Sequence, residues 1–309
     1  MKTDRVTSRS ETREGMVRVP GGRVWYQIQG ANSKGVPVLT LHGGPGVPHD
    51  YLEPLSALSS ERPVVFYDQL GCGNSDKPED ESLWTVRRYV DELAIVRKSL
   101  GLDNVHLLGH SWGTMLAVDY MLRKRPKGVV SMVLSGPALS AARWTTDTRA
   151  YLKRMPRSIQ KTIRENEKAG TYDSAEYQEA MAAFYKKHLC RIDPWPDCLN
   201  RAFQKLAQPV YSLMMGASEF TFTGSLKSYE RADRLKDIDL PVLFTAGQFD
   251  EASPKTTRYY QSKLPGSEIH VFKGASHVHH IEREKEYLGV VRDFCGRSER
   301  QRKESRAKS

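Results

Sequence analysis

The strongest constraint on the fold is a serine flanked by glycines at residues 109–113, which read Gly-His-Ser-Trp-Gly. Apolar residues precede this motif, a helix-like run over residues 114–124 follows it, and Pro126 ends the run. This order predicts a strand, a sharp turn with Ser111 at its apex, and a helix. Glycine on either side of the serine allows the strand and the helix to approach closely. The turn would lift the Ser111 hydroxyl above the edge of a sheet, which makes it a candidate nucleophile.

Other apolar runs that end in glycine-rich or polar loops predict the remaining strands of the same sheet. Five such runs cover residues 36–41, 63–67, 129–134, 241–246 and 268–272. A hairpin is expected over 16–20 and 23–29, and helical spacing is present over 85–100 and 284–294. Strands that alternate with helices predict an α/β fold with a mostly parallel sheet and helices on both of its faces.

The pattern changes over residues 138–224, where no strand is expected. Helical spacing covers residues 175–189 and 199–215 of this stretch. We therefore expect a helical cap, inserted between strands of a core that is formed by residues 15–137 and 225–295. The charged ends of the chain, residues 1–14 and 296–309, are expected to be disordered tails.

Four loops that follow predicted strands contain residues that could take part in catalysis, namely His42, Ser111, Asp250 and His277. Loops at the carboxyl ends of parallel strands lie on one edge of a sheet, so these loops should meet beneath the cap. His277 is the candidate base for Ser111, and it follows the last predicted strand through a short loop. His279 and His280 are close by and are its rivals.

A base of this kind needs a carboxylate to orient it and to stabilise the imidazolium. Asp250 is the candidate, and Glu251 is its competitor. The developing oxyanion needs two amides. Trp112, at the start of the helix after Ser111, offers one, and the glycine-rich loop after residue 41 offers Gly43 or Gly44 as the other.

The composition, with 39% hydrophobic and 27% charged residues, is ordinary for a soluble globular protein. The net charge is +10, and much of this excess lies in residues 296–309, where no aromatic residues interleave, so we expect a solvated tail and no nucleic-acid partner. Residues 1–14 lack the apolar core of a signal peptide, and no run approaches the length of a membrane helix, so no membrane partner is expected.

The chain has four cysteines and no Cys-x-x-Cys pair, so no metal or redox motif is predicted. Cys190 and Cys198 could lie near each other, but a disulfide between them would require an oxidising compartment. We therefore expect a cytoplasmic protein with reduced thiols.

In these motifs the chain resembles the α/β-hydrolase fold and, within it, the proline iminopeptidase family of serine aminopeptidases. The motifs that carry the resemblance occur in family order at residues 42–46, 67–75, 109–113, 218–224, 247–251 and 276–277. The chain departs from the family pattern at Leu70, where members have arginine, and at Thr114, where they usually have glycine. We expect these departures to affect the rim of the site and not the triad.

The resemblance implies that acidic side chains bind the free amino group of the substrate. By motif position these are Glu219 and Glu251, and a protonated amine in a partly dry pocket does need nearby carboxylates. The alternative for Glu219 is a structural ion pair with an arginine of the cap, such as Arg191 or Arg201.

Together these observations predict a serine hydrolase that removes an N-terminal residue, proline or another, from short peptides, or that cleaves amino-acid amides or esters. No metal or organic cofactor is implied. An esterase or lactonase that uses the same triad on a small metabolite is the alternative enzyme. A non-catalytic binding protein of the same fold is the alternative from another class.

Overall fold

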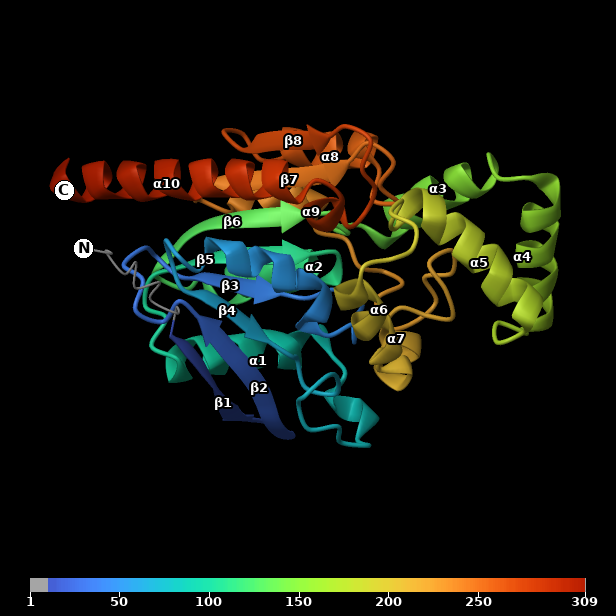
Figure 1. Cartoon of the computed structure of the whole chain (residues 1–309), viewed down its shortest axis with the longest axis horizontal. Coiled ribbons are helices and arrows are strands. Elements are labelled where there is room, and N and C mark those ends of the chain that lie inside the picture. Colours follow the sequence, from blue (N-terminus) through green and yellow to red (C-terminus); the bar gives the residue numbers. More distant parts are fainter. Residues whose placement is uncertain (1–10, 309) are drawn as a thin grey trace, which may run out of the picture.

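A computed structural model describes residues 11–308 of the chain (Figure 1). Its centre is an eight-stranded sheet with the order β1-β2-β4-β3-β5-β6-β7-β8. The first two strands are antiparallel to their neighbours, and the other six are parallel. The strands are β1 (Thr12–Val19), β2 (Gly22–Gln29), β3 (Val38–Leu41), β4 (Val64–Tyr67), β5 (Val105–His110), β6 (Val129–Ser135), β7 (Val242–Gly247) and β8 (Glu268–Phe272). The predicted α/β class, the mostly parallel sheet and the N-terminal hairpin are thereby confirmed.

Neighbouring residues of the central strands contribute to two separate cores, because successive side chains of a strand point to opposite faces of the sheet. Val65 and Tyr67 pack in one core with helices α1 (Val86–Ser99), α2 (Trp112–Lys124) and α8 (Pro254–Ser262). Val64 and Phe66 pack in the other core with the 3₁₀ segment η1 (His49–Leu58) and helix α10 (Glu284–Lys308). The sheet is therefore covered on both faces, as a parallel sheet requires.

Five helices occupy the stretch between β6 and β7, and we call them the helical segment. They lie at one end of the sheet (Figure 1) and comprise α3 (Ala141–Leu152), α4 (Arg157–Ala169), α5 (Ala175–His188), α6 (Asp197–Gln204) and α7 (Gln208–Met214). The segment has a small core of its own, which includes Ile163, Phe184 and Phe220. The remaining short elements are η2 (Glu81–Leu83), η3 (Ala232–Asp237) and α9 (His279–Glu282).

The sequence predicted one helix over 199–215, but the chain forms two, α6 and α7. Pro209 lies in the first turn of α7, where its fixed φ and missing N–H are tolerated. The same ring would clash inside a continuous helix and remove one of its hydrogen bonds, so the chain breaks before it.

The expected disorder of the C-terminal tail is wrong, as is the expected end of the last helix at residue 294. Helix α10 continues to Lys308. Its Glu299 carboxylate accepts hydrogen bonds from the buried Arg62 guanidinium and from Nε2 of His106 on β5. Arg302 donates to the carbonyl of Gly128, 3.2 Å away. Two charged side chains of this helix, Glu299 and Arg302, are therefore partners of the core, which the pattern of charges alone did not reveal.

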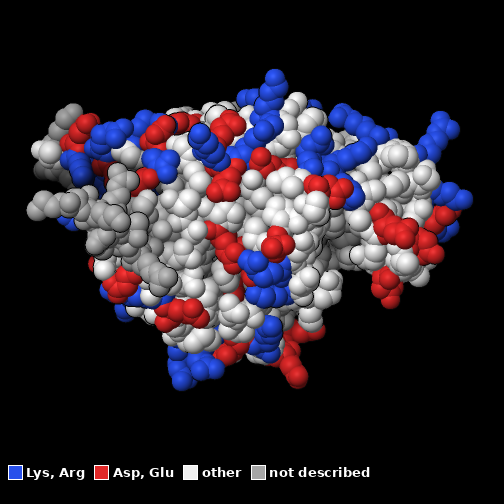
Figure 2. All heavy atoms as spheres, in the orientation of Figure 1, with Lys and Arg blue, Asp and Glu red and all other residues white. Residues whose placement is uncertain are grey.

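The N-terminal tail was also assigned incorrectly in part, because residues 12–14 belong to β1 and pair with β2. The rest of that predicted tail, residues 1–10, lies outside the described residues. On the face shown in Figure 2, lysine and arginine side chains are interspersed with acidic ones. No helix within residues 11–308 is long and apolar enough to cross a membrane.

We predict that Glu299→Gln lowers the free energy of unfolding at neutral pH by about 1 to 3 kcal/mol, because it weakens the pairing of a buried guanidinium. The hydrogen bond from His106 is the main cause that lowers the pKa of Glu299, from its ordinary 4.5 to about 2. A depressed carboxyl pKa stabilises the fold above the ordinary value, and this contribution is lost as the pH falls toward 2.

Urea unfolding at several pH values measures this effect. The difference between wild type and Glu299→Gln should shrink as the pH falls below 4.5. Glu304→Gln, at an exposed position of the same helix, is the matched control. An equal loss in both variants would contradict an anchoring role for Glu299.

Candidate active site

The turn between β5 and α2 holds Ser111 in a backbone conformation that is rare for residues other than glycine, with φ 54° and ψ −121°. The Ser111 amide donates to the carbonyl of Ser135, 2.9 Å away, and its carbonyl accepts from the amide of Thr114 at 2.8 Å. A Cβ at Gly113 would collide with the backbone of Leu41 on β3, and one at Gly109 would collide with Gly113. The two glycines are thus required by the close approach of helix and strands.

His277 lies on the loop after β8, and Asp250 lies on the loop after β7. The His277 Nδ1–H donates to Oδ1 of Asp250 over 2.7 Å. The Asp250 carboxylate also accepts from the amides of Gly247 at 3.2 Å and Ala252 at 2.8 Å. Burial acts to raise the pKa of Asp250, but the attraction and the hydrogen bond of His277 outweigh it and lower the pKa to about 2. Asp250 is therefore an ionised carboxylate at neutral pH.

The two rival histidines are buried, and Nε2 of each ring is hydrogen-bonded to groups other than Ser111. Nε2 of His279 accepts from the hydroxyls of Ser135 and Thr245, each 2.9 Å away. Nε2 of His280 donates to the carbonyl of Tyr51 over 3.0 Å. Of the three histidines, only His277 lines a cavity together with Ser111.

The amides considered for the oxyanion differ in their partners. The amide of Gly43 donates to the hydroxyl of Tyr51, 2.8 Å away. Within residues 11–308, no acceptor is hydrogen-bonded to the amide of Gly44 or of Trp112. The geometry thus favours Gly44 over Gly43 as the partner of Trp112.

Sequence reasoning missed a hydrogen-bonded chain that connects these loops. The Tyr51 hydroxyl, which receives the Gly43 amide, donates to Nδ1 of His110 over 2.9 Å. Nε2 of His110 in turn donates to the carbonyl of His277 at 3.0 Å. Burial lowers the pKa of His110 well below its ordinary range, which keeps the ring neutral. The carbonyl of His277 can only accept a hydrogen bond, and it therefore fixes the proton on Nε2. Only the position of His110 inside the serine motif could have pointed to it, and nothing in the sequence pointed to Tyr51.

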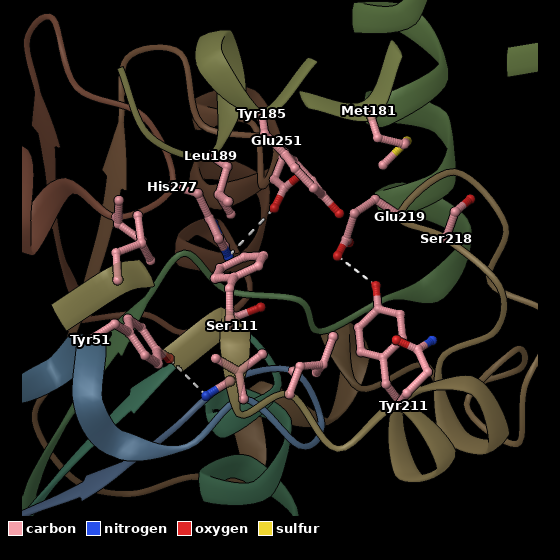
Figure 3. Close-up of a pocket in the computed structure, with 18 of the residues that line it drawn as sticks. Tyr51, Ser111, Met181, Tyr185, Leu189, Tyr211, Ser218, Glu219, Glu251 and His277 are labelled. Carbon is pink, nitrogen blue, oxygen red and sulfur yellow. Dashed lines mark hydrogen bonds and ion pairs between the residues drawn. The ribbon is translucent and has the colours of Figure 1, made fainter. Parts of the chain in front are cut away.

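Glu219 and Glu251 line the same cavity as Ser111 and His277 (Figure 3). Glu219 accepts a hydrogen bond from the Tyr211 hydroxyl over 2.6 Å. Oε1 of Glu251 lies 3.8 Å from Nε2 of His277, and its Oε2 is buried with no hydrogen-bond partner among the described residues. Glu251 therefore lies next to the candidate base but does not replace Asp250 as the residue that orients it.

The expected arginine partners of Glu219 are engaged elsewhere. Arg201 pairs with Glu53 and with Asp50 of η1, and Arg191 lies over the ring of Phe249. The structure thus gives no support to a structural ion pair as the role of Glu219.

Two positions expected at the rim lie deeper. Leu70 is buried in the core. Thr114 is also buried, and its hydroxyl donates to the carbonyl of Ser111 over 2.6 Å and accepts from the amide of Ala138 at 3.1 Å. The expectation of a rim position was wrong, because a motif shows which residues are near the turn but not which way their side chains point.

The cavity has a volume of about 480 Å³, which is in the range of small-molecule sites. The sheet edge contributes Ser111, His277 and the glycine loop to its wall. The helical segment and the loop that follows it contribute many aromatic and apolar side chains, among them Tyr172, Tyr177, Met181, Tyr185, Leu189, Phe203 and Tyr211. A small, mostly apolar ligand with one cationic group fits this lining.

Comparison with known proteins agrees with this geometry. A family model described as the alpha/beta hydrolase fold matches residues 36–284. A proline iminopeptidase of Heyndrickxia coagulans is 46% identical over 282 residues, which cover 91% of this chain and 98% of the relative. A proline iminopeptidase of Lactobacillus delbrueckii subsp. lactis is 39% identical, and the match covers 88% of this chain and 94% of the relative.

A crystal structure of a proline iminopeptidase from Mycobacterium smegmatis superposes with a TM-score of 0.86 at 34% identity, over 93% of this chain and 98% of that chain. From the parallel sheet, the serine turn and these matches, we conclude that the chain belongs to the proline iminopeptidase family of α/β-hydrolase enzymes.

Proposed function

We propose that this enzyme is a serine aminopeptidase that removes the N-terminal residue, proline or another, from short peptides. One observation carries the proposal. The cavity that contains Ser111 and His277 also contains two carboxyl groups, Glu219 and Glu251, and an oxygen of Glu251 has no hydrogen-bond partner among the described residues. A buried carboxyl group without a partner is costly, and a protonated α-amine is a natural ligand for it.

In the proposed acylation step, Oγ of Ser111 attacks the carbonyl carbon of the first residue. Its proton passes to Nε2 of His277, and Asp250 stabilises the resulting imidazolium through the Nδ1 hydrogen bond of 2.7 Å. The amides of Gly44 and Trp112 donate to the oxyanion. The C–N bond then breaks, and the imidazolium protonates the departing amine.

In the deacylation step, a water molecule repeats the attack on the acyl-enzyme. His277 accepts the proton of the water, and Ser111 leaves with a proton returned by the imidazolium. The hydrogen-bonded chain through Tyr51 and His110 connects the glycine loop to the carbonyl of His277. We assign Tyr51 and His110 as positioning residues, since neither is required to exchange a proton with the substrate.

We propose that the helical segment acts as a cap over this site. The carbonyl of His188, at the end of α5, accepts from the amides of both Glu251 and His277, at 3.3 and 3.0 Å. The segment is thus attached to the loops that carry the base and one amine-binding acid. A cap at this place restricts access to short, unfolded substrates, and we propose a cytoplasmic location for their turnover.

We predict that Ser111→Ala lowers kcat by about 10³- to 10⁶-fold, because it removes the nucleophile. His277→Ala should lose a similar amount, and the double variant should be little worse than either single one, since the two residues act as a unit. Turnover of an amino-acid naphthylamide measures these rates.

Labelling with a fluorophosphonate probe separates an enzyme from a binding protein. The probe should modify wild type and leave Ser111→Ala unlabelled. Unlabelled folded wild type, or a Ser111→Ala rate within tenfold of wild type, would remove Ser111 from the mechanism.

We predict that Glu219→Gln lowers kcat/KM for free-amine substrates, because it removes a buried partner of the ammonium group. The decrease should correspond to a loss of about 2 to 5 kcal/mol in transition-state stabilisation. Acetylation of the substrate amine should cost wild type a similar amount. Esters without an amine should be affected far less by the substitution.

Glu165→Gln, on the exposed surface of α4, is the matched control and should retain the wild-type preference. If wild type does not distinguish free from acetylated amines, the aminopeptidase proposal fails and an esterase takes its place.

A further inference from the structure

Two carboxyl groups, of Asp250 and Glu251, flank the imidazole of His277, and a third, of Glu219, lines the same cavity as Glu251. The three differ in how well they are compensated. The Asp250 carboxylate accepts hydrogen bonds from Nδ1 of the ring and from two backbone amides. Glu251 lies 3.8 Å from Nε2 on the other side of the ring. Glu219 is directed into the same cavity as Glu251 and is held by Tyr211 (Figure 3). A single imidazole is therefore accompanied by three acidic side chains in and beside this cavity.

No lysine or arginine is among the described residues that line the cavity, so none of these residues supplies a permanent cation to the acidic groups. The groups that face Glu251 are Asp250 beside it, His277, and Glu219, Tyr185 and Tyr211 of the helical segment and the loop after it. The His188 carbonyl accepts from the backbone amides of Glu251 and His277, so it does not compensate the Glu251 side chain.

The burial of the Glu251 side chain makes this excess of acidic groups more costly. Its side chain is buried, and no hydrogen bond satisfies Oε2 within residues 11–308. An ionised carboxylate in such a place is costly, whereas a protonated carboxyl group is much less so. Burial, followed by repulsion from Glu219 and Asp250, accordingly raises the pKa of Glu251 well above its ordinary range. Burial also raises the pKa of Glu219, against the opposing effect of the Tyr211 hydrogen bond.

We propose that the Glu219–Glu251 pair shares one proton in the empty enzyme, and that the ammonium group of the substrate displaces this proton to solvent when it binds. This inference rests on the proposed aminopeptidase function. The exchange is balanced in charge, because the pair loses H⁺ and gains an ammonium group, so the buried site carries the same net charge before and after binding. Two carboxyl groups that interact this closely titrate as a pair, so the proton belongs to both.

The exchange gives the site a specific way to select its substrate. A free-amine substrate supplies the cation that the two carboxylates lack, and it converts them to a compensated ion pair at the moment when the scissile carbonyl reaches Ser111. A substrate without an amine leaves the proton in place and gains no ion pair. The glutamate pair is then a proton-exchange site and not a pair of permanently ionised carboxylates.

Isothermal titration calorimetry of wild type with leucinol tests the proposal, because this amino alcohol keeps the ammonium group and has no scissile bond. Titrations at neutral pH in phosphate and in HEPES, which differ in ionisation enthalpy and carry no primary amine, give the number of protons released. We expect release of about one proton per leucinol bound. The association constant should rise up to about tenfold per pH unit while the pair is still protonated, and should level off once it has ionised.

Two variants identify where the proton resides. The double variant Glu219→Gln/Glu251→Gln should release no proton with any leucinol that it binds, because neither carboxyl group remains to hold one. His277→Ala should retain the release. Release that disappears in His277→Ala, or that persists in the double variant, would assign the proton to another group and overturn the proposal.

The wild-type titration alone separates this inference from the function on which it rests. Leucinol that binds with the same heat in both buffers, and with a pH-independent constant, overturns the proton exchange and leaves the amine site intact. Absence of leucinol binding, together with equal turnover of free and acetylated amines, overturns both.

Discussion

The backbone of Ser111 is the constraint on which the rest of the structure depends. A left-handed φ on a serine costs on the order of 1–3 kcal/mol, and it persists only where its surroundings hold it. Here those surroundings are two strands and a helix, since the carbonyl of Ser135 on β6 takes its amide and Gly113 packs against the backbone of Leu41 on β3. The order of the central strands and the placement of α2 therefore follow from the requirements of one turn.

The acids next to this turn illustrate how far the surroundings decide the state of a side chain. Asp250 and Glu251 are adjacent in sequence and both are buried. The pKa of Asp250 falls to about 2 because His277 compensates it, whereas burial and then repulsion from acidic neighbours raise the pKa of Glu251. One carboxyl group is thus held ready to stabilise an imidazolium, and the other is left in need of a cation. The roles that we propose for the two residues, orienting a base and binding an amine, differ because of these partners and not because of the residue type.

The parts farthest from the turn depend on the core in different ways. The helical segment has its own apolar cluster around Phe184 and Phe220, and it contacts the site through the end of α5. Helix α10 has no such cluster over its last turns and is anchored by charge, with Glu299 between Arg62 and His106. Buried polar contacts of this kind need a specific partner at each atom, which is why they fix the position of a helix.

The sequence by itself determined the class of the fold, the turn at Ser111 and the loops that bring Asp250 and His277 to the same edge, because strand and turn signals are local and parallel strands share one edge. Only the tertiary structure decided between His277 and its neighbours, since His279 and His280 are distinguished by the hydroxyl and carbonyl groups that their rings meet. It also placed Tyr51, whose hydroxyl connects Gly43 to the distant His110, and Tyr211, which lies outside the motif of its partner Glu219, and it turned the charged end of the chain into a helix. These outcomes depend on contacts between residues distant in sequence, as in the pairing of Glu299 with Arg62, and no local pattern encodes such a contact.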